Sequence, residues 1–166
     1  MNLYCLRHAK AEARGPKFAQ NAKRPLTADG EEIAKRVAQG MVEMDLSFDL
    51  IITSPFLRAL KTAEITAHVF KTDKLWTSSN LAVDGNPRKL IDELNENYGA
   101  LNSILLVGHE PFLSTLMSVL LSGDQGVQIE LKKSGLAKLE VEDLRFGKCA
   151  CLEWLLTPRQ LQRYGK

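Results

Sequence analysis

Short apolar runs that alternate with helix-like segments are the feature of this sequence that most restricts its fold. The runs are rich in branched side chains and lack regular apolar-polar alternation, which is typical of parallel strands buried on both faces. Longer segments with helical spacing of apolar residues separate them. The alternation predicts a three-layer α/β/α fold with a mainly parallel sheet. The predicted parallel strands are 3–6 (LYCL), 50–53 (LIIT) and 104–107 (ILLV).

Two further apolar runs near the C-terminus are predicted to add antiparallel pairing. Residues 135–141 (GLAKLEV) and 150–156 (ACLEWLL) are separated by the turn-like EDLRFGK. Such a short connection suits an antiparallel hairpin, whereas parallel strands need a longer crossover. We therefore expect a sheet that is mainly parallel and has at least one antiparallel strand.

Capping residues mark where four helices begin or end. Ser, Thr and Asn side chains accept hydrogen bonds from first-turn amides, Pro suits the first helical position, and Gly ends helices in the left-handed conformation. The predicted signals are Thr27 for a helix within 26–44, Ser54 with Pro55 for 54–70, Asn86 with Pro87 for 86–94, and Gly123 as the end of 110–123.

Length and composition fit a single domain that covers residues 1–166. With 45% hydrophobic and 25% charged residues, the chain can form an ordinary core and surface. Its apolar runs are far shorter than the roughly 20 residues that span a bilayer, and its N-terminus has no charged-then-apolar leader. We expect a cytoplasmic protein without membrane contact. Cys5, Cys149 and Cys151 lack metal-ligand spacing and are expected to be buried free thiols.

Positive charge is concentrated near the N-terminus. The whole chain carries a net charge of +2, but six basic residues and one acid, Glu12, lie between Arg7 and Arg24. Phe18 is the one aromatic side chain there for base stacking, and no groove-reading motif accompanies it. We interpret the stretch as a solvated loop near an anion site and expect no nucleic-acid partner.

Polar, chemically reactive residues follow three of the predicted strands. LYCL is followed by Arg7 and His8, and ILLV by His109 after one glycine. LIIT is followed by Ser54, with Arg58 one helical turn later. Ligands in open α/β sheets bind beyond the carboxyl ends of the strands, so we expect these side chains to share one site.

The two arginines and two histidines suit a compact dianion such as phosphate. Arginine binds pairs of oxygen atoms, each charge-assisted hydrogen bond contributes roughly 1.5–3 kcal/mol, and helix N-termini add a positive dipole. The surrounding cations are expected to lower the pKa of His8 and keep its imidazole neutral and nucleophilic. They also stabilise a transferring phosphoryl group, so neither a metal nor another cofactor is expected. The third histidine, His68, is expected at the surface.

Each of these residues also has a purely structural interpretation. An Arg-His pair after a strand is common, and His109 fits a buried histidine bonded to the backbone. The segment from Ser54 to Arg58 fits a capped helix with a surface arginine. Their shared position at strand ends favours the functional interpretation, because each residue would otherwise lie there by coincidence.

Several segments resemble the histidine phosphatase (phosphoglycerate mutase-like) superfamily. LRHAKAEA resembles its RHG signature, with Ala9 in place of the usual glycine, and further segments are similar to the SixA-type phosphohistidine phosphatases. The resemblance implies a phosphoglycerate mutase-like fold and phosphorylation of His8. It implies a pocket completed by Arg7, Arg58 and His109, with Arg24 at the rim; Ser54 is the other predicted substrate-binding residue. The further segments are RPLTADG, DLIITSPFLRALKTA, ILLVGHEPFL and WLLTPRQL.

An acid suited to protonating an alkoxide is not evident in the sequence. Superfamily members that act on alcohol phosphates usually supply Glu or Asp after the second arginine, and Asp84 is the nearest candidate here. Asp84 precedes Gly85, and Asp-Gly is a common turn pair. General acid catalysis contributes roughly 10²–10⁴-fold for a poor leaving group, whereas imidazole, with a pKa of about 6.5, can leave without a dedicated acid. The sequence therefore favours N–P over O–P hydrolysis.

The resulting hypothesis is a two-step hydrolysis of phosphohistidine through phospho-His8. From the resemblance alone, the substrate is expected to be a phosphorylated histidine domain of a phosphorelay, with the protein acting as a monomer in signal transduction. Two alternatives stay open. One is a phosphatase of the same superfamily that acts on small phosphate esters with Asp84 as the acid. The other is a module that binds phosphate without catalysis.

Overall fold

The structure, a computed structural model, describes residues 1–165 and is built around one six-stranded sheet. Its strands are β1 Asn2–Arg7, β2 Leu50–Thr53, β3 Leu75–Thr77, β4 Ser103–Gly108, β5 Leu136–Val141 and β6 Ala150–Leu156. The strand order is β3-β2-β4-β1-β5-β6. The first four strands in this order pair in parallel, and β5 runs antiparallel to both of its neighbours. The prediction of a mainly parallel sheet with an antiparallel strand is confirmed.

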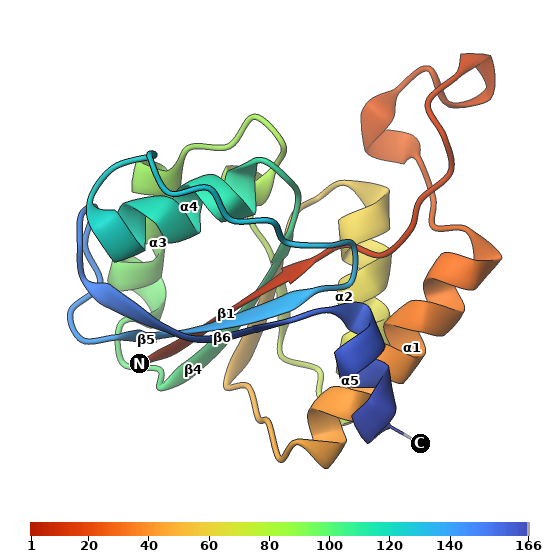
Figure 1. The fold of residues 1–166 in the computed structure, drawn as a ribbon. Coiled ribbons are helices and arrows are strands. Elements are labelled where there is room, and N and C mark those ends of the chain that lie inside the picture. Colours follow the sequence, from red (N-terminus) through yellow and green to blue (C-terminus); the bar gives the residue numbers. More distant parts are fainter. Residues whose placement is uncertain (166) are drawn as a thin grey trace.

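Helices cover both faces of the sheet and make three layers (Figure 1). One face carries α1 Ala28–Glu43, α2 Leu57–Phe70 and α5 Pro158–Tyr164, and the other carries α3 Pro87–Tyr98 and α4 Phe112–Ser122. Three short 3₁₀ helices lie in the connections: η1 Pro16–Phe18, η2 Asn21–Lys23 and η3 Ser79–Leu81. The predicted α/β/α layering is confirmed. No helix within residues 1–165 combines the length and apolar character needed to cross a membrane.

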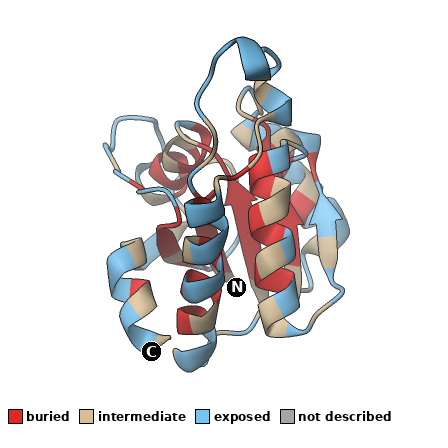
Figure 2. Ribbon diagram, turned by 90° about the vertical axis from the view of Figure 1, so that its right-hand side faces the viewer, coloured by how far each residue is buried: buried red, intermediate tan, exposed pale blue. Residues whose placement is uncertain are grey.

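The central strand β1 is buried on both sides, which explains its uninterrupted apolar run. Successive side chains of a strand point to opposite faces of the sheet. Leu3 and Cys5 pack in the core beside α3 and α4, while Tyr4 and Leu6 pack in the core beneath α1 and α2. Figure 2 shows the buried segments on the sheet and on the inward faces of the helices. β1 therefore carries the chain through the middle of the molecule to its carboxyl edge.

Three of the four predicted helix signals are confirmed. The Gly30 amide donates to the Thr27 hydroxyl at 2.9 Å, and the Asn86 side chain caps the first turn of α3, which begins at Pro87. Gly123 follows α4 in the left-handed conformation, with φ of 94°. These local hydrogen bonds need only neighbouring residues, so the sequence pattern was sufficient to locate them.

The prediction that Ser54 and Pro55 open the second helix is wrong. α2 begins at Leu57, and Phe56 precedes it without a side-chain cap. The Ser54 hydroxyl is instead hydrogen-bonded to His109 Nε2 at 2.8 Å and accepts the Phe56 amide at 3.3 Å. Because these contacts hold the serine in a turn, the helix starts after it.

Two regular elements of the fold were missed by the sequence analysis. β3 has only three residues and pairs with β2 alone. α5 begins with a capping box in which the Thr157 and Gln160 side chains bond each other's backbone amides. The capping box is a sequence signal that could have predicted α5, whereas β3 is too short for a periodic pattern.

The three cysteines differ in exposure. Cys5 is buried in β1, as predicted, and burial raises the pKa of its thiol to about 12. Cys149 is half-buried and Cys151 is exposed, so the prediction of burial is wrong for both. They lie just before and within β6, the outermost strand on its side of the sheet, where one edge faces solvent.

The segment between β1 and α1 projects beyond the carboxyl end of the sheet (Figure 1). We call residues 10–24 the projecting arm. Ala11 and Leu26 form an isolated antiparallel bridge at its base, and η1 and η2 lie along it. The carboxyl ends of β1, β2 and β4 lie beside this base, and the predicted site residues follow those strands.

Candidate active site

The parallel pairing of β1 and β4 brings the two predicted catalytic histidines together. Arg7 is paired with Gly108 at the ends of these strands, and the His8 amide donates to the Gly108 carbonyl at 3.0 Å. His8 and His109 therefore follow at the same level, and their ring centroids are 5.1 Å apart. The strand register thus builds the centre of the site from segments far apart in the sequence.

The hydrogen bonds of His8 define the protonation state of its ring. Nδ1 lies 2.7 Å from the Ala9 carbonyl, which can only accept, so Nδ1 carries the proton. Arg58 Nε, which can only donate, lies 3.1 Å from Nε2, so Nε2 presents its lone pair. Burial lowers the pKa of His8 to about 3, and the charges of Arg58 and Arg7 add to the decrease. The predicted decrease is present, with burial and not the cations as its largest cause.

Ala9 occupies the corner where the resembling signature has glycine. Its side chain is buried against Leu26 and Ala34, and its φ is not positive, so alanine meets no conformational barrier there. The Ala9 amide donates to Thr62 Oγ1 at 3.1 Å, and the Thr62 hydroxyl donates to the Arg58 carbonyl at 2.7 Å. Ala9 therefore links the end of β1 to the first turn of α2.

Arg58 is held on two sides in the first turn of α2. It is 2% exposed, donates through Nε to His8, and donates through Nη1 to the Asn21 carbonyl of the projecting arm at 2.9 Å. Burial, followed by the charges of Arg24 and Arg14, lowers the pKa of Arg58 to about 10. The guanidinium therefore stays charged at neutral pH and has a fixed position beside the imidazole.

His109 is a second neutral imidazole in the same site. It is 1% exposed, its Nε2 is bonded to Ser54 Oγ at 2.8 Å, and its Nδ1 is buried without a partner among residues 1–165. The Phe56 ring packs edge-on with a centroid distance of 5.2 Å. Burial, followed by the charge of Arg58, lowers the pKa of His109 to about 3. Ser54 is itself fully buried, like His109 and Arg58, and joins the site through its bond to His109.

Arg7 and Glu110 add further buried polar atoms without partners. Arg7 Nη1 donates to the Leu131 carbonyl at 2.9 Å, while Arg7 Nε has no partner among the described residues. Glu110 Oε2 accepts from the Ser114 hydroxyl, and Oε1 is buried and unpaired in the same part of the chain. Burial raises the pKa of Glu110 against the opposing effects of Ser114 and Arg7. Arg7 Nε is thus an unpaired donor that an oxyanion can satisfy, whereas the carboxyl oxygen of Glu110 is not such a donor when it is ionised.

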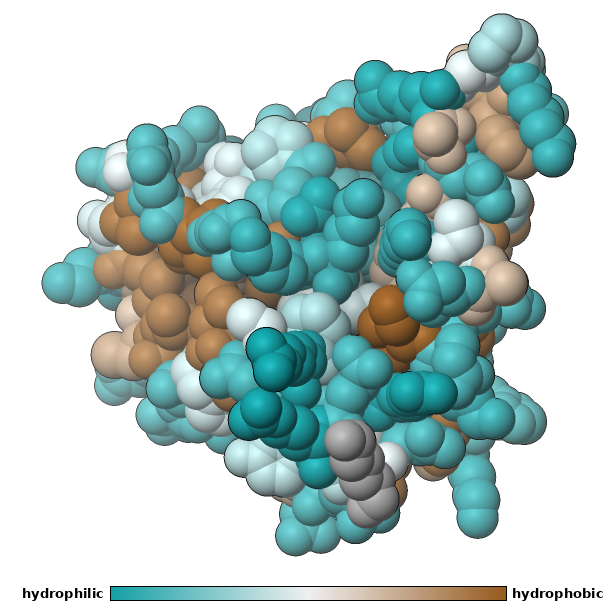
Figure 3. All heavy atoms as spheres, turned by 45° about the vertical axis from the view of Figure 1, so that its right-hand side comes forward, coloured by the Kyte–Doolittle hydropathy of each residue, from teal (hydrophilic) through white to brown (hydrophobic). Residues whose placement is uncertain are grey.

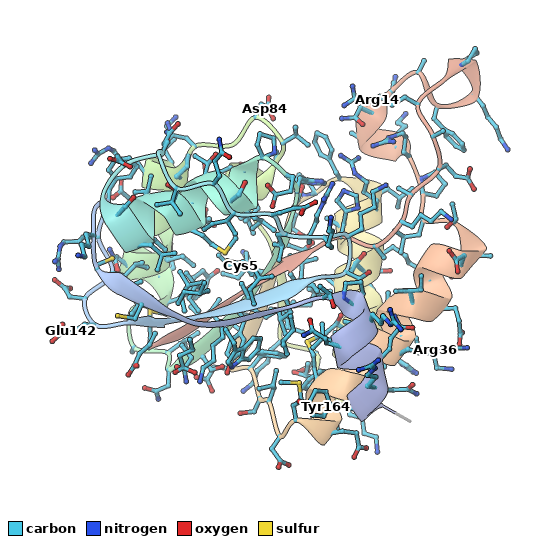
Figure 4. All side chains as sticks on the ribbon, in the orientation of Figure 1. Cys5, Arg14, Arg36, Asp84, Glu142 and Tyr164 are labelled. Atoms are coloured by element: carbon cyan, nitrogen blue, oxygen red, sulfur yellow. The ribbon has the colours of Figure 1, made fainter. Side chains whose placement is uncertain are left out.

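Arg24 and Asp84 lie outside the central group. Arg24 donates to the Glu12 carbonyl at 2.9 Å and to Asn21 Oδ1 at 3.0 Å, and its charge contributes to the lowered pKa of His109. Asp84 is exposed on the loop before α3, with its side chain directed outward (Figure 4). The structure thus gathers four of the predicted side chains, joins Ser54 to them through His109, places Arg24 at their edge, and leaves Asp84 at the surface. The four are Arg7, His8, Arg58 and His109.

Two residues of the site had no role assigned from the sequence. Glu110 directly follows His109 beyond the end of β4, so the strand-end rule could have included it. Thr62 lies four residues after Arg58 on the buried side of α2, a spacing that places both on one helix face. Within residues 1–165, no group of three or more His, Cys, Asp or Glu side chains is arranged to hold a metal ion.

Comparison with known proteins places these residues in a family. The sequence model of the "Histidine phosphatase superfamily (branch 1)" matches residues 3–82, which include Arg7, His8 and Arg58. The chain belongs to the histidine phosphatase superfamily. The protein is a phosphatase of this superfamily. The chain is also 36% identical over 140 residues to an uncharacterized protein of Picosynechococcus sp., a match that covers 84% of each chain.

Solved structures show the same fold. The protein histidine phosphatase SixA, complexed with tungstate, aligns with a TM-score of 0.83 and 21% identity over 97% of this chain and 99% of its own. A phosphoserine phosphatase mutant from Entamoeba histolytica, in complex with phosphoserine, aligns with a TM-score of 0.72 and 16% identity over 96% and 98% of the two chains. The predicted phosphoglycerate mutase-like fold of the superfamily is confirmed. At these identities the likeness establishes the fold and not the substrate.

Proposed function

We propose that this protein is a phosphohistidine phosphatase that hydrolyses the N–P bond of a phosphorylated histidine through a phospho-His8 intermediate. The observation that carries the proposal is the state of His8 Nε2, a lone pair on a neutral ring beside Arg58 Nε at 3.1 Å. A neutral imidazole is a competent nucleophile. The bond from Nδ1 to the Ala9 carbonyl stabilises the positive charge that develops on the ring as Nε2 forms its new bond.

In the first step, His8 Nε2 forms a bond to phosphorus while the N–P bond to the substrate imidazole breaks. Arg58 Nε–H loses its acceptor when Nε2 is bonded, so it becomes available to a phosphoryl oxygen. Arg7 Nε is a second donor without a partner among the described residues. We assign the Ser54 hydroxyl as the donor to Nε2 of His109, because its oxygen already accepts the Phe56 amide. The Nδ1–H of that ring is then a third donor. These groups stabilise the charge on the equatorial oxygens, and the leaving imidazole takes its proton from water.

In the second step, water attacks phospho-His8, inorganic phosphate leaves, and Nε2 regains its lone pair. The released phosphate carries the oxygen of the water, and the two water protons go to phosphate and solvent. The side chains named for the two steps are assembled by contacts within this chain, and we propose that the protein acts as a monomer.

The carboxyl groups near the site support an imidazole as the leaving group. Asp84 is exposed, and Glu110 has one oxygen buried and the other bonded to Ser114. In this arrangement Asp84 is at the surface, and Glu110 would have to release Ser114 or move its buried oxygen before it could protonate an alkoxide. Imidazole, with a pKa of about 6.5, can leave without a dedicated acid. We therefore propose a phosphorylated histidine domain in cytoplasmic signalling as the substrate class.

Trapping the phosphoenzyme tests this proposal. A histidine-containing phosphotransfer domain carrying radiolabelled phosphate is expected to lose it to the protein, with a base-stable, acid-labile label on His8 and release of inorganic phosphate. His8→Ala is expected neither to become labelled nor to release inorganic phosphate. His68→Ala, which changes an exposed histidine of α2, is the matched control and keeps the parent rate. Parent-level turnover by His8→Ala would overturn the mechanism, and binding without turnover of any phosphorylated substrate would favour a phosphate-binding module.

Hydrolysis of small phosphate esters is the second candidate function. It is favoured by the raised pKa of Glu110, since a carboxyl group that holds its proton to higher pH is suited to protonating an alkoxide. If esters are substrates, Glu110→Gln is expected to abolish phosphoserine turnover and to spare phosphohistidine. Asp84→Asn is the matched comparison, because Asp84 lies at the surface. Equal phosphoserine turnover by the parent and Glu110→Gln would exclude Glu110 as the acid.

A further inference from the structure

The projecting arm concentrates positive charge beside the site. Residues 10–24 contain five basic residues and one acid, a net charge of +4, so the remainder of the chain, with its net charge of −2, is weakly acidic. A local charge of this size creates an attractive field for an acidic partner. The five basic residues are Lys10, Arg14, Lys17, Lys23 and Arg24.

The cations of the projecting arm are exposed and largely unpaired. Arg14, Lys17 and Lys23 are exposed, and no carboxylate within residues 1–165 lies within ion-pair distance of them; Lys10 pairs with Asp29 at 3.2 Å. Figure 3 shows the arm as a protrusion with a mainly hydrophilic surface and a less hydrophilic area near its tip. Charges that form no internal ion pair remain available to a binding partner.

The arm is attached directly to the residue that holds His8. Arg58 donates from Nε to His8 and from Nη1 to the Asn21 carbonyl, so one guanidinium contacts both the imidazole and the arm. Arg24 closes the base of the arm by its bond to the Glu12 carbonyl. A partner seated on the arm is therefore positioned relative to the proposed nucleophile.

The outer cations of the arm differ from the charges that act on His8. The charges that lower the pKa of His8 come from Arg58, Arg7 and Lys133, and Lys17 and Lys23 are not among them. Lys17 instead lies over the Phe18 ring, with Nζ 5.4 Å from its centroid, in a shallow groove beside Pro16. The outer arm therefore offers cations around an aromatic side chain, a surface suited to something larger than a phosphoryl group.

Lys133 places positive charge near His8 from a different segment of the chain. Lys133 is exposed on the connection before β5, and its charge reaches His8. Arg14 and Arg24 come from the arm, and their charges reach Arg58. The site is therefore bordered by cations from two segments, a pattern complementary to an acidic surface around a phosphorylated side chain.

We propose that the projecting arm is a docking surface for an acidic protein face that surrounds the phosphorylated histidine. This inference rests on the proposed function, because it assigns the carrier of the phosphoryl group to a folded protein and not to a small molecule. Exposed charges of this kind act mainly on the rate of association. The arm therefore raises kcat/KM for a protein substrate and leaves turnover of free phosphohistidine unchanged.

A double charge reversal tests the docking surface. In Lys17→Glu/Lys23→Glu, kcat/KM for a phosphorylated histidine-containing phosphotransfer domain with an acidic face is expected to fall at least about tenfold, while turnover of free phosphohistidine stays within about twofold. Arg159→Glu/Arg163→Glu makes the same change in charge at exposed positions of α5 and is expected to alter neither rate. Equal losses on both substrates, or no loss on either, would overturn the inference.

A binding measurement separates failure of the docking surface from failure of the proposed function. Fluorescence anisotropy with the unphosphorylated domain requires no turnover, and the arm reversal is expected to weaken its Kd about tenfold. Loss of binding with no phosphohistidine turnover by the parent protein would retain docking and reject the proposed function. Normal phosphohistidine turnover by the parent protein, together with the same Kd for the parent and the arm reversal, would retain the proposed function and reject the docking surface. Arm-dependent binding of single-stranded DNA in place of the domain would assign the arm to a nucleic acid and reject a protein partner.

Discussion

The buried pocket and the projecting arm carry positive charge in opposite ways. Arg58 is 2% exposed and donates to two fixed acceptors, whereas Lys17 and Lys23 are exposed and have no ion-pair partner within residues 1–165. Buried charge acts strongly over short distances, and exposed charge acts over about 10 Å and is screened by salt. From this comparison we propose that transfer of the phosphoryl group and capture of its carrier are separable properties of this molecule.

Removal of the proposed nucleophile should separate the two regions most strongly. His8→Ala is expected to lower kcat on a phosphohistidine protein by at least about a thousandfold, because the attacking atom is lost. Its Kd for the unphosphorylated domain should stay unchanged, because the projecting arm is intact. Phosphate release and anisotropy measure the two quantities. A parallel loss of binding would show that the regions are not separable.

Arg58→Lys tests whether charge alone is enough in the pocket. Lysine keeps the positive charge but cannot place two donors on His8 Nε2 and the Asn21 carbonyl in the geometry of guanidinium. We expect kcat to fall about 100-fold and amide exchange around Asn21 to accelerate. Arg36→Lys, on the exposed side of α1 (Figure 4), is the control. An unchanged kcat would mean that a point charge suffices.

Ser54→Ala removes the bond that positions His109. Because Ser54 is buried and bonded to His109 Nε2, we expect kcat on phosphohistidine to fall about tenfold while KM stays nearly constant. Ser54→Cys keeps a weak donor of similar size and should give an intermediate kcat. Steady-state kinetics measure both quantities. A change confined to KM would instead place Ser54 in contact with substrate.

The two neutral histidines predict that mild acid destabilises the fold. His8 and His109 have a pKa of about 3 in the folded state, below the ordinary value of about 6.5. Between these values the unfolded chain binds protons that the folded chain does not, so stability is full above about pH 6.5 and decreases as pH falls towards 3. The free energy of unfolding falls by up to about 1.4 kcal/mol per pH unit for each ring. Urea unfolding at pH 7 and 5 should show the decrease, and His109→Asn should make it shallower.

Salt should have the smallest effect and should distinguish the regions without mutation. Raising the salt concentration from about 50 to about 300 mM shortens the distance over which exposed charges act to a few ångströms. We therefore expect kcat/KM for the phosphorylated domain to fall severalfold. Free phosphohistidine, which uses the buried donors, should change less than twofold. Equal sensitivity of the two substrates would indicate that the arm contributes nothing beyond the pocket.

Local patterns in the sequence predicted most of the fold. The apolar runs located five of the six strands, and the caps at Thr27, Asn86 and Gly123 located helix ends, because each depends on neighbouring residues. The prediction that Ser54 caps a helix was wrong, because its hydroxyl is bonded to His109, which follows a different strand. The short strand β3 lies below the length at which periodicity is informative.

By itself, the sequence determined the α/β class and placed Arg7, His8, Arg58 and His109 at strand ends or within about one helical turn of them. It could do so because hydrophobic periodicity and strand-end chemistry are local properties. Only the tertiary structure decided which atoms meet. The pairing of Arg7 with Gly108 put the two imidazoles side by side, and the contact from Arg58 assigned the lone pair of His8 to Nε2. These contacts depend on strand order and register, which are set by packing over the whole chain and not by any one segment.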